Sequence, residues 1–161
     1  LELVAPSAPA CDAVVLGVFP DLRVDDLDRA LAWLRGGAEL LCLHRNRFWL
    51  DATGQERLGP GAWAAALEAA VPQVRSATAG KPEPAVYREA LESLGADPAE
   101  TLFISDDPCS DLAGARRLGL ATVLVLSGKH RDRGVLDTLA ADQQPDLVLA
   151  RPDQLTKDTL A

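Results

Sequence analysis

The stretch TLFISDDPCSDLAGARRLG, residues 101–119, decides the fold of this chain. Its apolar run Leu102–Ile104 predicts a buried strand, and the carboxylates that follow directly predict a loop. Apolar residues then recur at helical spacing up to Gly119, which can adopt the left-handed conformation that ends a helix. We therefore expect a strand, an acidic loop and a helix in that order.

The acidic loop carries Asp106, Asp107 and Asp111. In an open α/β sheet, ligands bind in the crevice beyond the carboxyl ends of the strands. Carboxylates there, with few cations nearby, suit a hard ion such as Mg²⁺. Asp106 and Asp107 would repel each other at the end of a buried strand unless a positive charge compensates. The loop is therefore a predicted metal site with Asp106 as its main residue, and the role of Asp107 stays open.

A purely structural explanation covers one of these acids. Acidic residues that follow a strand often cap the next helix, and Asp111 is well placed to accept from free N–H groups there. The same explanation is favoured for Asp25, Asp26 and Asp28, which crowd the start of another expected helix. It does not account for the adjacent pair in the loop.

Lys81 is the natural charge partner for the loop. It lies one α/β unit before the acids, and its neighbours Gly80 and Pro82 restrict the backbone at the point where the side chain must be aimed. Lysine acts at phosphate sites as a compact point charge. We therefore expect Lys81 to join the acids in a phosphate-binding site.

The rest of the chain alternates strands with helices, which predicts a parallel α/β layer. Further strands are expected at residues 13–19, 39–44, 121–126 and 147–150, and further helices from about Asp25, from Pro60, at 83–94, at 135–141 and from about Asp153.

Composition limits the possible partners. The 161 residues carry a net charge of −8 with a pI near 4.7, which argues against a nucleic-acid or anionic membrane partner. Three cysteines without a CxxC or Cys/His spacing argue against disulfides and structural zinc and favour a reducing cytoplasm. No apolar stretch is long enough for a membrane span, and no secretory leader is recognised. We expect a soluble cytoplasmic protein.

Three segments together resemble the C-terminal half of haloacid dehalogenase-like (HAD) phosphatases: AGKPEPAVYREALESLG (79–95), ETLFISDDPCSDLAGARRLGLATVLVLSGK (100–129) and PDLVLARPDQL (145–155). The resemblance is to the C2-capped branch that contains the p-nitrophenylphosphatase-like and phospholysine/phosphohistidine/pyrophosphate phosphatase-like enzymes. Residues 12–72 resemble the later part of that branch's α/β cap, and the stretch LLCLHRNRFWLDATGQERLGPGAWAAALEAA (40–70) is most similar to the pyrophosphate-phosphatase-like members. The resemblance implies the rear half of a parallel Rossmann-like core at 80–161, part of an α/β cap at 12–79, and a linker or strand remnant at 1–11.

The resemblance also implies residue roles. Lys81 matches the lysine that holds the phosphoryl oxygens, and Asp106 matches the aspartate that binds Mg²⁺ directly. Asp111 matches the second acid of the same motif, which places a metal-bound water or pairs with the lysine. Arg45 and Asn46, in the cap, are candidate substrate contacts. The implied substrate is a small phosphorylated metabolite.

One element of the family is missing from these residues. Its chemistry starts with a DxD motif after an apolar strand, whereas Asp26 and Asp28 form DxD at a helix start. The chain also begins at Leu1 and contains no methionine, which favours a fragment or a processed product. We expect a phosphatase fragment that is inactive alone and is either a homo-oligomer or completed by an N-terminal segment.

Two alternatives stay open. A degenerate HAD-like module could bind metal or phosphate, or regulate, without turnover. A receiver-like signalling domain also carries paired aspartates at a strand end, but its lysine follows the acids, whereas Lys81 precedes them.

Overall fold

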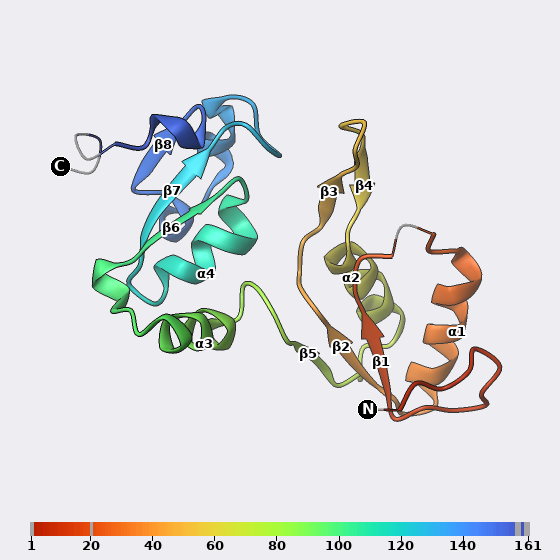
Figure 1. Cartoon of the computed structure of the whole chain (residues 1–161). Helices are drawn as coiled ribbons and strands as arrows, with labels where there is room; N and C mark the ends of the chain where they lie inside the picture. Colours follow the sequence, from red (N-terminus) through yellow and green to blue (C-terminus); the bar gives the residue numbers. More distant parts are fainter. Residues whose placement is uncertain (1, 20, 157–158, 160–161) are drawn as a thin grey trace. The chain divides into compact units, whose positions relative to one another are not determined.

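The computed structural model describes residues 2–19, 21–156 and 159. The chain divides into two compact units, residues 1–80 and 81–161 (Figure 1). This division falls where the sequence predicted the cap to end, although the assignment of the first unit to a cap stays a prediction. Each unit is an α/β structure with a parallel sheet, as expected.

The first unit has seven helices and strands within its described residues: β1 (Ala13–Leu16), α1 (Val24–Arg35), β2 (Glu39–Cys42), β3 (Phe48–Leu50), β4 (Glu56–Leu58), α2 (Pro60–Ala70) and β5 (Ser76–Thr78). Its main sheet is parallel with the order β1-β2-β5, and β3 pairs with β4 as a separate antiparallel hairpin. Residues 2–12 contain no helix or strand. The expected strand at 39–44 ends two residues early, at Cys42.

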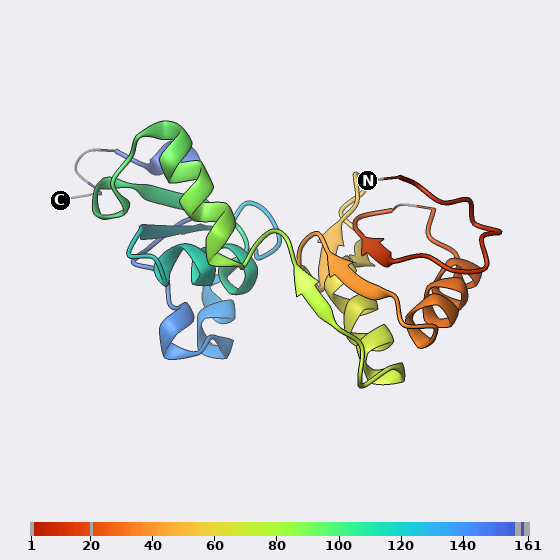
Figure 2. The ribbon, with the colours of Figure 1, turned by 90° about the horizontal axis from the view of Figure 1, so that it is seen from below.

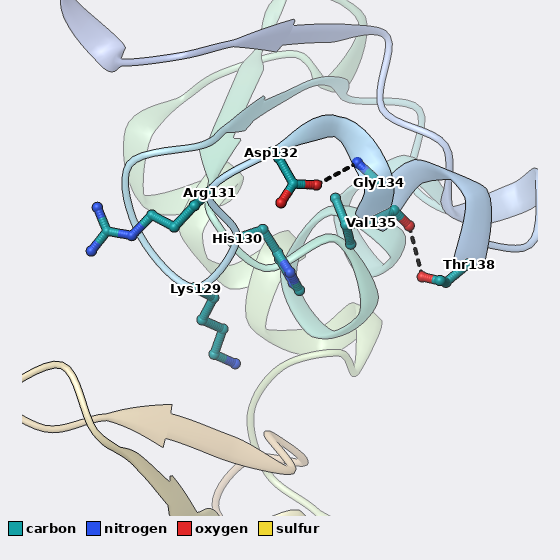
Figure 3. A pocket seen from close by; sticks show the side chains of 7 residues that line it. All are labelled: Lys129, His130, Arg131, Asp132, Gly134, Val135 and Thr138. Carbon is teal, nitrogen blue, oxygen red and sulfur yellow. Dashed lines mark hydrogen bonds between the residues drawn. The ribbon is translucent and has the colours of Figure 1, made fainter.

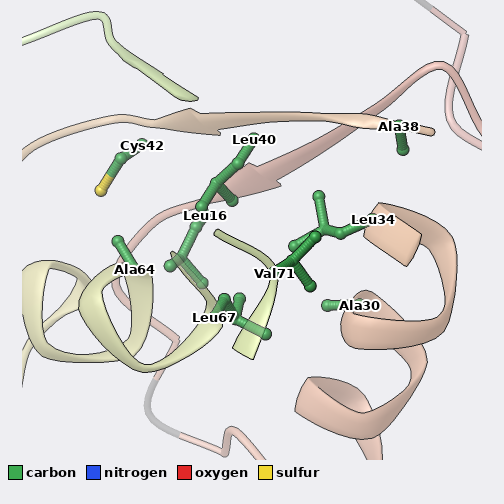
Figure 4. Close-up of a cluster of buried hydrophobic side chains, with 9 residues drawn as sticks. All are labelled: Leu16, Ala30, Leu34, Ala38, Leu40, Cys42, Ala64, Leu67 and Val71. Atoms are coloured by element: carbon green, nitrogen blue, oxygen red, sulfur yellow. The ribbon is translucent and has the colours of Figure 1, made fainter. Parts of the chain in front are cut away.

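Both helices of this unit pack on one face of its sheet (Figure 4). Leu40 of β2 is buried against Leu34 of α1 and Leu67 of α2, within one apolar cluster. Asp26 caps α1, because its carboxylate accepts a hydrogen bond of 3.0 Å from the Arg23 backbone N–H. The helix-start explanation for this acid is therefore correct.

The second unit contains α3 (Pro84–Leu94), β6 (Leu102–Ser105), α4 (Ala113–Arg116), β7 (Ala121–Val125) and β8 (Leu147–Leu149). Short 3₁₀ segments lie at Pro98–Glu100, Arg133–Thr138, Ala141–Gln143 and Pro152–Gln154, and a π-helical turn at Pro108–Leu112. The sheet is parallel with the order β6-β7-β8 (Figure 2). Connections between parallel neighbours must cross over, which accounts for the alternation of helices and strands.

The register of this sheet places two loops side by side. Ser105, the last residue of β6, pairs with Leu124 near the end of β7. The acidic loop therefore leaves the sheet beside the turn Ser127–Lys129 that follows β7. Val123 and Leu124 point to opposite faces of the sheet and are both fully buried, as the sequence predicted for this strand.

Two helix predictions in this unit are wrong. The expected helix at 135–141 is replaced by two 3₁₀ segments, Arg133–Thr138 and Ala141–Gln143. The Gln144 side chain donates to the carbonyl oxygens of Leu136 and Leu139, and the Asp132 carboxylate accepts from the Gly134 N–H. These local side-chain bonds compete with a continuous helix. The expected helix from Asp153 is reduced to a 3₁₀ turn at Pro152–Gln154, and its continuation at 157–158 and 160–161 lies outside the described residues.

Candidate metal and phosphate site

The acidic loop is shaped by Asp107, not by Asp111. The Asp107 side chain accepts a 2.8 Å hydrogen bond from the Ser110 N–H, and its carbonyl oxygen accepts from the N–H groups of Asp111 and Leu112 at 3.1 Å. The bond to Leu112 spans five residues and defines the π turn before α4. The capping role that was the structural alternative for Asp111 therefore belongs to Asp107.

Lys81 and Asp111 form the centre of the site. The Lys81 ammonium lies 2.7 Å from Asp111 Oδ2, and the Ser105 hydroxyl donates to the same oxygen at 2.8 Å. The Asp111 side chain is 11% exposed and that of Lys81 is 38% exposed. The lysine side chain is thus partly exposed to solvent, and its ammonium contacts a nearly buried carboxylate.

The Asp106 carboxylate is held by a backbone N–H group of the turn after β7. Its Oδ2 accepts a hydrogen bond of 2.9 Å from the Lys129 N–H. A Cβ atom on Gly128 would lie 1.8 Å from the same oxygen, so only glycine permits this approach. The carboxylate therefore lies directly against the Gly128–Lys129 turn.

A second lysine, Lys129, neutralises the charge of Asp107 in the loop. The Lys129 ammonium forms an ion pair with Asp107 Oδ2, and both side chains are nearly buried. The cations are thus divided between Asp111 and Asp107. Among the described residues, no ion pair is found for Asp106, and a carboxylate without an ammonium partner is the one best suited to receive a metal ion.

Tyr87 of α3 contacts the backbone of the acidic loop through its hydroxyl. Its hydroxyl lies 2.8 Å from the Asp111 carbonyl oxygen and 3.2 Å from that of Ser110. Gly114 lets the ring approach, because a Cβ there would lie 2.4 Å from the hydroxyl oxygen. Burial, together with the charges of Asp111 and Asp107, raises the pKa of Tyr87 well above its usual value of 10. The phenol therefore stays protonated and can donate.

The chemistry of these residues fits a magnesium ion. Asp111 Oδ1 is buried and has no hydrogen-bond partner among the described residues, which is costly for a carboxylate oxygen unless a ligand compensates. Within the same residues, no cluster of three or more His, Cys, Asp or Glu side chains is arranged to hold a metal. Two carboxylates are compatible with Mg²⁺, which commonly keeps several waters and phosphate oxygens as its other ligands.

A hollow of about 490 Å³ adjoins the loop in the same unit (Figure 3). Its lining consists of Lys129, His130, Arg131, Asp132, Gly134, Val135 and Thr138. The His130 ring points into it, and the Arg131 side chain extends away from it (Figure 3). Lys129 therefore lines the hollow and also contacts Asp106 and Asp107 of the acidic loop.

Arg45 and Asn46 lie in the first unit. The Arg45 guanidinium makes two hydrogen bonds to Glu68, at 2.9 and 3.1 Å, and another of 2.8 Å to Thr78. It links α2 to β5 in this way. Asn46 Oδ1 is buried without a hydrogen-bond partner in the described residues. Their roles as substrate contacts stay predictions.

The sequence-based site is only part of what the structure brings together. Lys81 was expected as the charge partner of the acids, with pairing to Asp111 as one of two alternatives, and in the structure it pairs with Asp111. Asp106 lies in the same loop. Lys129 and Tyr87 were not assigned to the site. For Lys129 a signal existed, since the turn after the strand at 121–126 lies at the sheet edge that carries the acids. For Tyr87 the sequence showed only an apolar helix position.

Comparison with known proteins identifies the class. The profile of the HAD-hydrolase-like family matches residues 78–155. Haloacid dehalogenase-like hydrolase domain-containing protein 2 of Bos taurus is 37% identical over 121 residues, which are 74% of this chain and 46% of that protein. The chain thus spans about half the length of the curated relatives it matches.

Two solved structures are similar in fold. The 4-nitrophenylphosphatase of Thermotoga maritima superposes with a TM-score of 0.75 at 25% identity, over 93% of this chain and 55% of that one. The glycerol phosphate phosphatase of Mycobacterium tuberculosis, solved in complex with magnesium, has a TM-score of 0.69 at 27% identity, over 86% and 40%. The chain therefore shares its α/β fold with two phosphatases. Residues 78–155 thus match the HAD-like hydrolase family, and the chain is similar to p-nitrophenylphosphatase-like proteins.

Among the described residues, no helix combines the length and apolar character that crossing a bilayer requires.

Proposed function

We propose that this chain supplies the metal- and phosphate-binding part of a Mg²⁺-dependent HAD-type phosphatase. The observation that carries the proposal is the division of charge in the acidic loop. Lys81 lies 2.7 Å from Asp111, whereas Asp106 accepts a backbone N–H and has no ion-pair partner in the described structure. We infer that the Asp106 carboxylate binds a cation and that the Lys81 ammonium binds an anion, both beside the acidic loop.

In this proposal, Asp106 and Asp111 hold the metal ion. When bound, Mg²⁺ neutralises charge on the transferring phosphoryl group. The Lys81 ammonium, oriented by Asp111, contacts the phosphoryl oxygens and stabilises the negative charge that they carry during transfer. Ser105 keeps the Asp111 carboxylate oriented through its hydroxyl, and Tyr87 anchors the backbone beneath it.

The nucleophile would come from outside these 161 residues. Covalent phosphoryl transfer needs a positioned carboxylate that attacks phosphorus in line, with water then hydrolysing the aspartyl-phosphate. The DxD at Asp26 and Asp28 lies in the first turns of α1, where Asp26 is used as a cap. The chain covers 46% of the Bos taurus relative, which is consistent with a longer protein that carries the nucleophile.

The substrate class we propose is a small phosphomonoester or phosphoanhydride metabolite in the cytoplasm, with Arg45 and Asn46 as contacts from the cap. Both solved structures reported above are named as phosphatases of small compounds, and one contains magnesium. The chain would act as a homo-oligomer or together with the segment that carries the nucleophile.

Mg²⁺ binding tests the proposal directly. Titration calorimetry of the chain should show a site that Asp106→Asn weakens by at least tenfold, because the substitution removes the charge of a direct ligand. Asp137→Asn removes an exposed acid of the same unit and should leave the affinity unchanged. Equal Mg²⁺ affinities of wild type and Asp106→Asn would refute the site assignment.

The absence of a DxD motif after any strand of this sequence also favours a second candidate, a metal- or phosphate-binding regulatory module without turnover. The intact mass of the native gene product separates the two, because a phosphatase requires a product clearly heavier than 17.1 kDa. A product of that mass that binds Mg²⁺ and does not hydrolyse p-nitrophenyl phosphate would establish the module.

A further inference from the structure

We propose that Asp107 and Lys129 are positioning residues, which fix the orientation of the Asp106 carboxylate. The inference rests on the proposed function and assigns a role to the one acid of the loop that the proposed reaction does not use. It follows from the way a single residue, Lys129, contacts two consecutive acids with two different groups.

Lys129 contacts Asp106 through its backbone and Asp107 through its side chain. Its N–H donates to Asp106 Oδ2 at 2.9 Å, and its ammonium pairs with Asp107 Oδ2. The turn that carries Lys129 is therefore attached to the acidic loop at two points. Movement of this turn would shift the donor on which the orientation of Asp106 depends.

The ion pair is a firm attachment because it is buried and its acid is itself held. The side chains of Lys129 and Asp107 are 10% and 8% exposed. Asp107 Oδ1 accepts from the Ser110 N–H at 2.8 Å, and the Asp107 N–H donates to the Ser105 hydroxyl at 3.2 Å. Separating the two charges would leave both of them poorly solvated, which is unfavourable.

Gly128 makes the orientation of Asp106 sensitive to the position of the turn. A Cβ at this residue would lie 1.8 Å from Asp106 Oδ2 and 2.6 Å from Asp106 Cβ. The carboxylate thus has no free space on that side. Its orientation is set by the turn, and the position of the turn is set by the Asp107–Lys129 pair.

Positioning and simple electrostatics predict opposite effects of removing the Lys129 charge. The loss of a cation near Asp106 makes the local potential more negative, which alone would strengthen the binding of Mg²⁺. If the pair positions Asp106, the same change loosens the carboxylate and weakens Mg²⁺ binding. The sign of the change therefore distinguishes the two roles.

The experiment compares Lys129→Met with Arg131→Met, which removes the same charge from an exposed side chain two residues away. In the metal-free chain, amide hydrogen exchange at residue 129 should accelerate at least tenfold in Lys129→Met. The amides of Val123 and Leu124 in β7 should stay within twofold. Mg²⁺ affinity should fall at least fivefold in Lys129→Met and change less than twofold in Arg131→Met.

Gly128→Ala provides a second test that leaves every charge in place, and it decides the question if Lys129→Met fails to fold. The added methyl group must displace the Asp106 carboxylate, so exchange at residue 129 should accelerate and Mg²⁺ affinity should fall as before. Unchanged exchange at residue 129 in both variants, or tighter Mg²⁺ binding by Lys129→Met, would overturn the inference. A wild-type chain that binds no Mg²⁺ would refute the proposed function, and the exchange measurement would still decide the positioning role.

Discussion

The hydroxyl of Tyr87 lies 2.8 Å from the carbonyl oxygen of Asp111, so the only tyrosine of the chain anchors the residue that pairs with Lys81. The bond joins α3 to the acidic loop across 24 residues of sequence. It fixes the backbone of Asp111 from one side, while Lys81 and Ser105 fix its carboxylate from the other. The site is thus supported by a buried contact that the proposed chemistry itself does not use.

Tyr87→Phe should destabilise the second unit by about 1–2 kcal/mol, because two buried carbonyl oxygens lose their donor. Urea unfolding followed by far-UV circular dichroism measures the effect. Ser93→Ala is the control, since its exposed hydroxyl donates to the Ala90 carbonyl oxygen and its loss should change stability by less than about 0.5 kcal/mol. Equal stability of Tyr87→Phe and wild type would show that the anchor is dispensable.

The titration of Tyr87 should be displaced to high pH. Burial and the nearby carboxylates raise its pKa above 10 in the folded chain, so the folded state holds this proton more tightly than the unfolded state. The resulting stabilisation is fully present below pH 10 and is lost as the pH rises through the folded-state pKa. Tyrosinate absorbance should therefore appear only well above pH 10. Half-ionisation near pH 10 in the folded chain would contradict the buried environment.

The Lys81–Asp111 pair should couple measurably in a double-mutant cycle. Lys81→Met leaves a carboxylate that is 11% exposed without its cation and should cost about 1–2 kcal/mol, a value reduced from that of a fully buried pair because Lys81 is partly exposed. Asp111→Asn in the Lys81→Met background should recover part of that loss. A cycle with no coupling energy would indicate that the two side chains do not interact in solution.

The outline of the site could be predicted from sequence because it depends on local patterns. An apolar run before Asp106 indicates a strand end, and glycine and proline around Lys81 indicate a fixed loop. Asp107 and Lys129 could not be paired in this way, because their contact depends on the register between β6 and β7. In this register Ser105 lies opposite Leu124, and a single sequence does not contain that information.

Two of the differences from the sequence-based expectations come from polar side chains that bond to nearby backbone groups. Asp107 caps the π turn in place of Asp111, and Gln144 donates to carbonyl groups that a helix at 135–141 would have used. Each bond depends on which of several nearby side chains has the better geometry for bonding to the backbone in the folded structure. Hydrophobic periodicity, on which the helix predictions relied, does not report on this competition.

The Arg45–Glu68 pair should make the first unit sensitive to acid. Hydrogen bonds from Arg45 hold the pKa of Glu68 below its ordinary value of 4.5, despite the opposing effect of burial. The folded state therefore binds this proton less readily than the unfolded state. The pair stabilises the unit at pH values above 4.5, and this stabilisation is lost as the pH falls through the folded-state pKa of Glu68.

Glu68→Gln removes the titrating group and tests this sensitivity. Trp33, Trp49 and Trp63 all belong to the first unit, so tryptophan fluorescence during urea unfolding reports on that unit alone. The free energy of unfolding of wild type should exceed that of Glu68→Gln by about 1 kcal/mol at pH 7, a value typical of a partly exposed pair. This difference should shrink toward zero near pH 3. Glu56→Gln, at an exposed position of β4, should match wild type at both pH values. A difference for Glu68→Gln that is the same at pH 7 and pH 3 would mean that Glu68 contributes by packing and not through its charge.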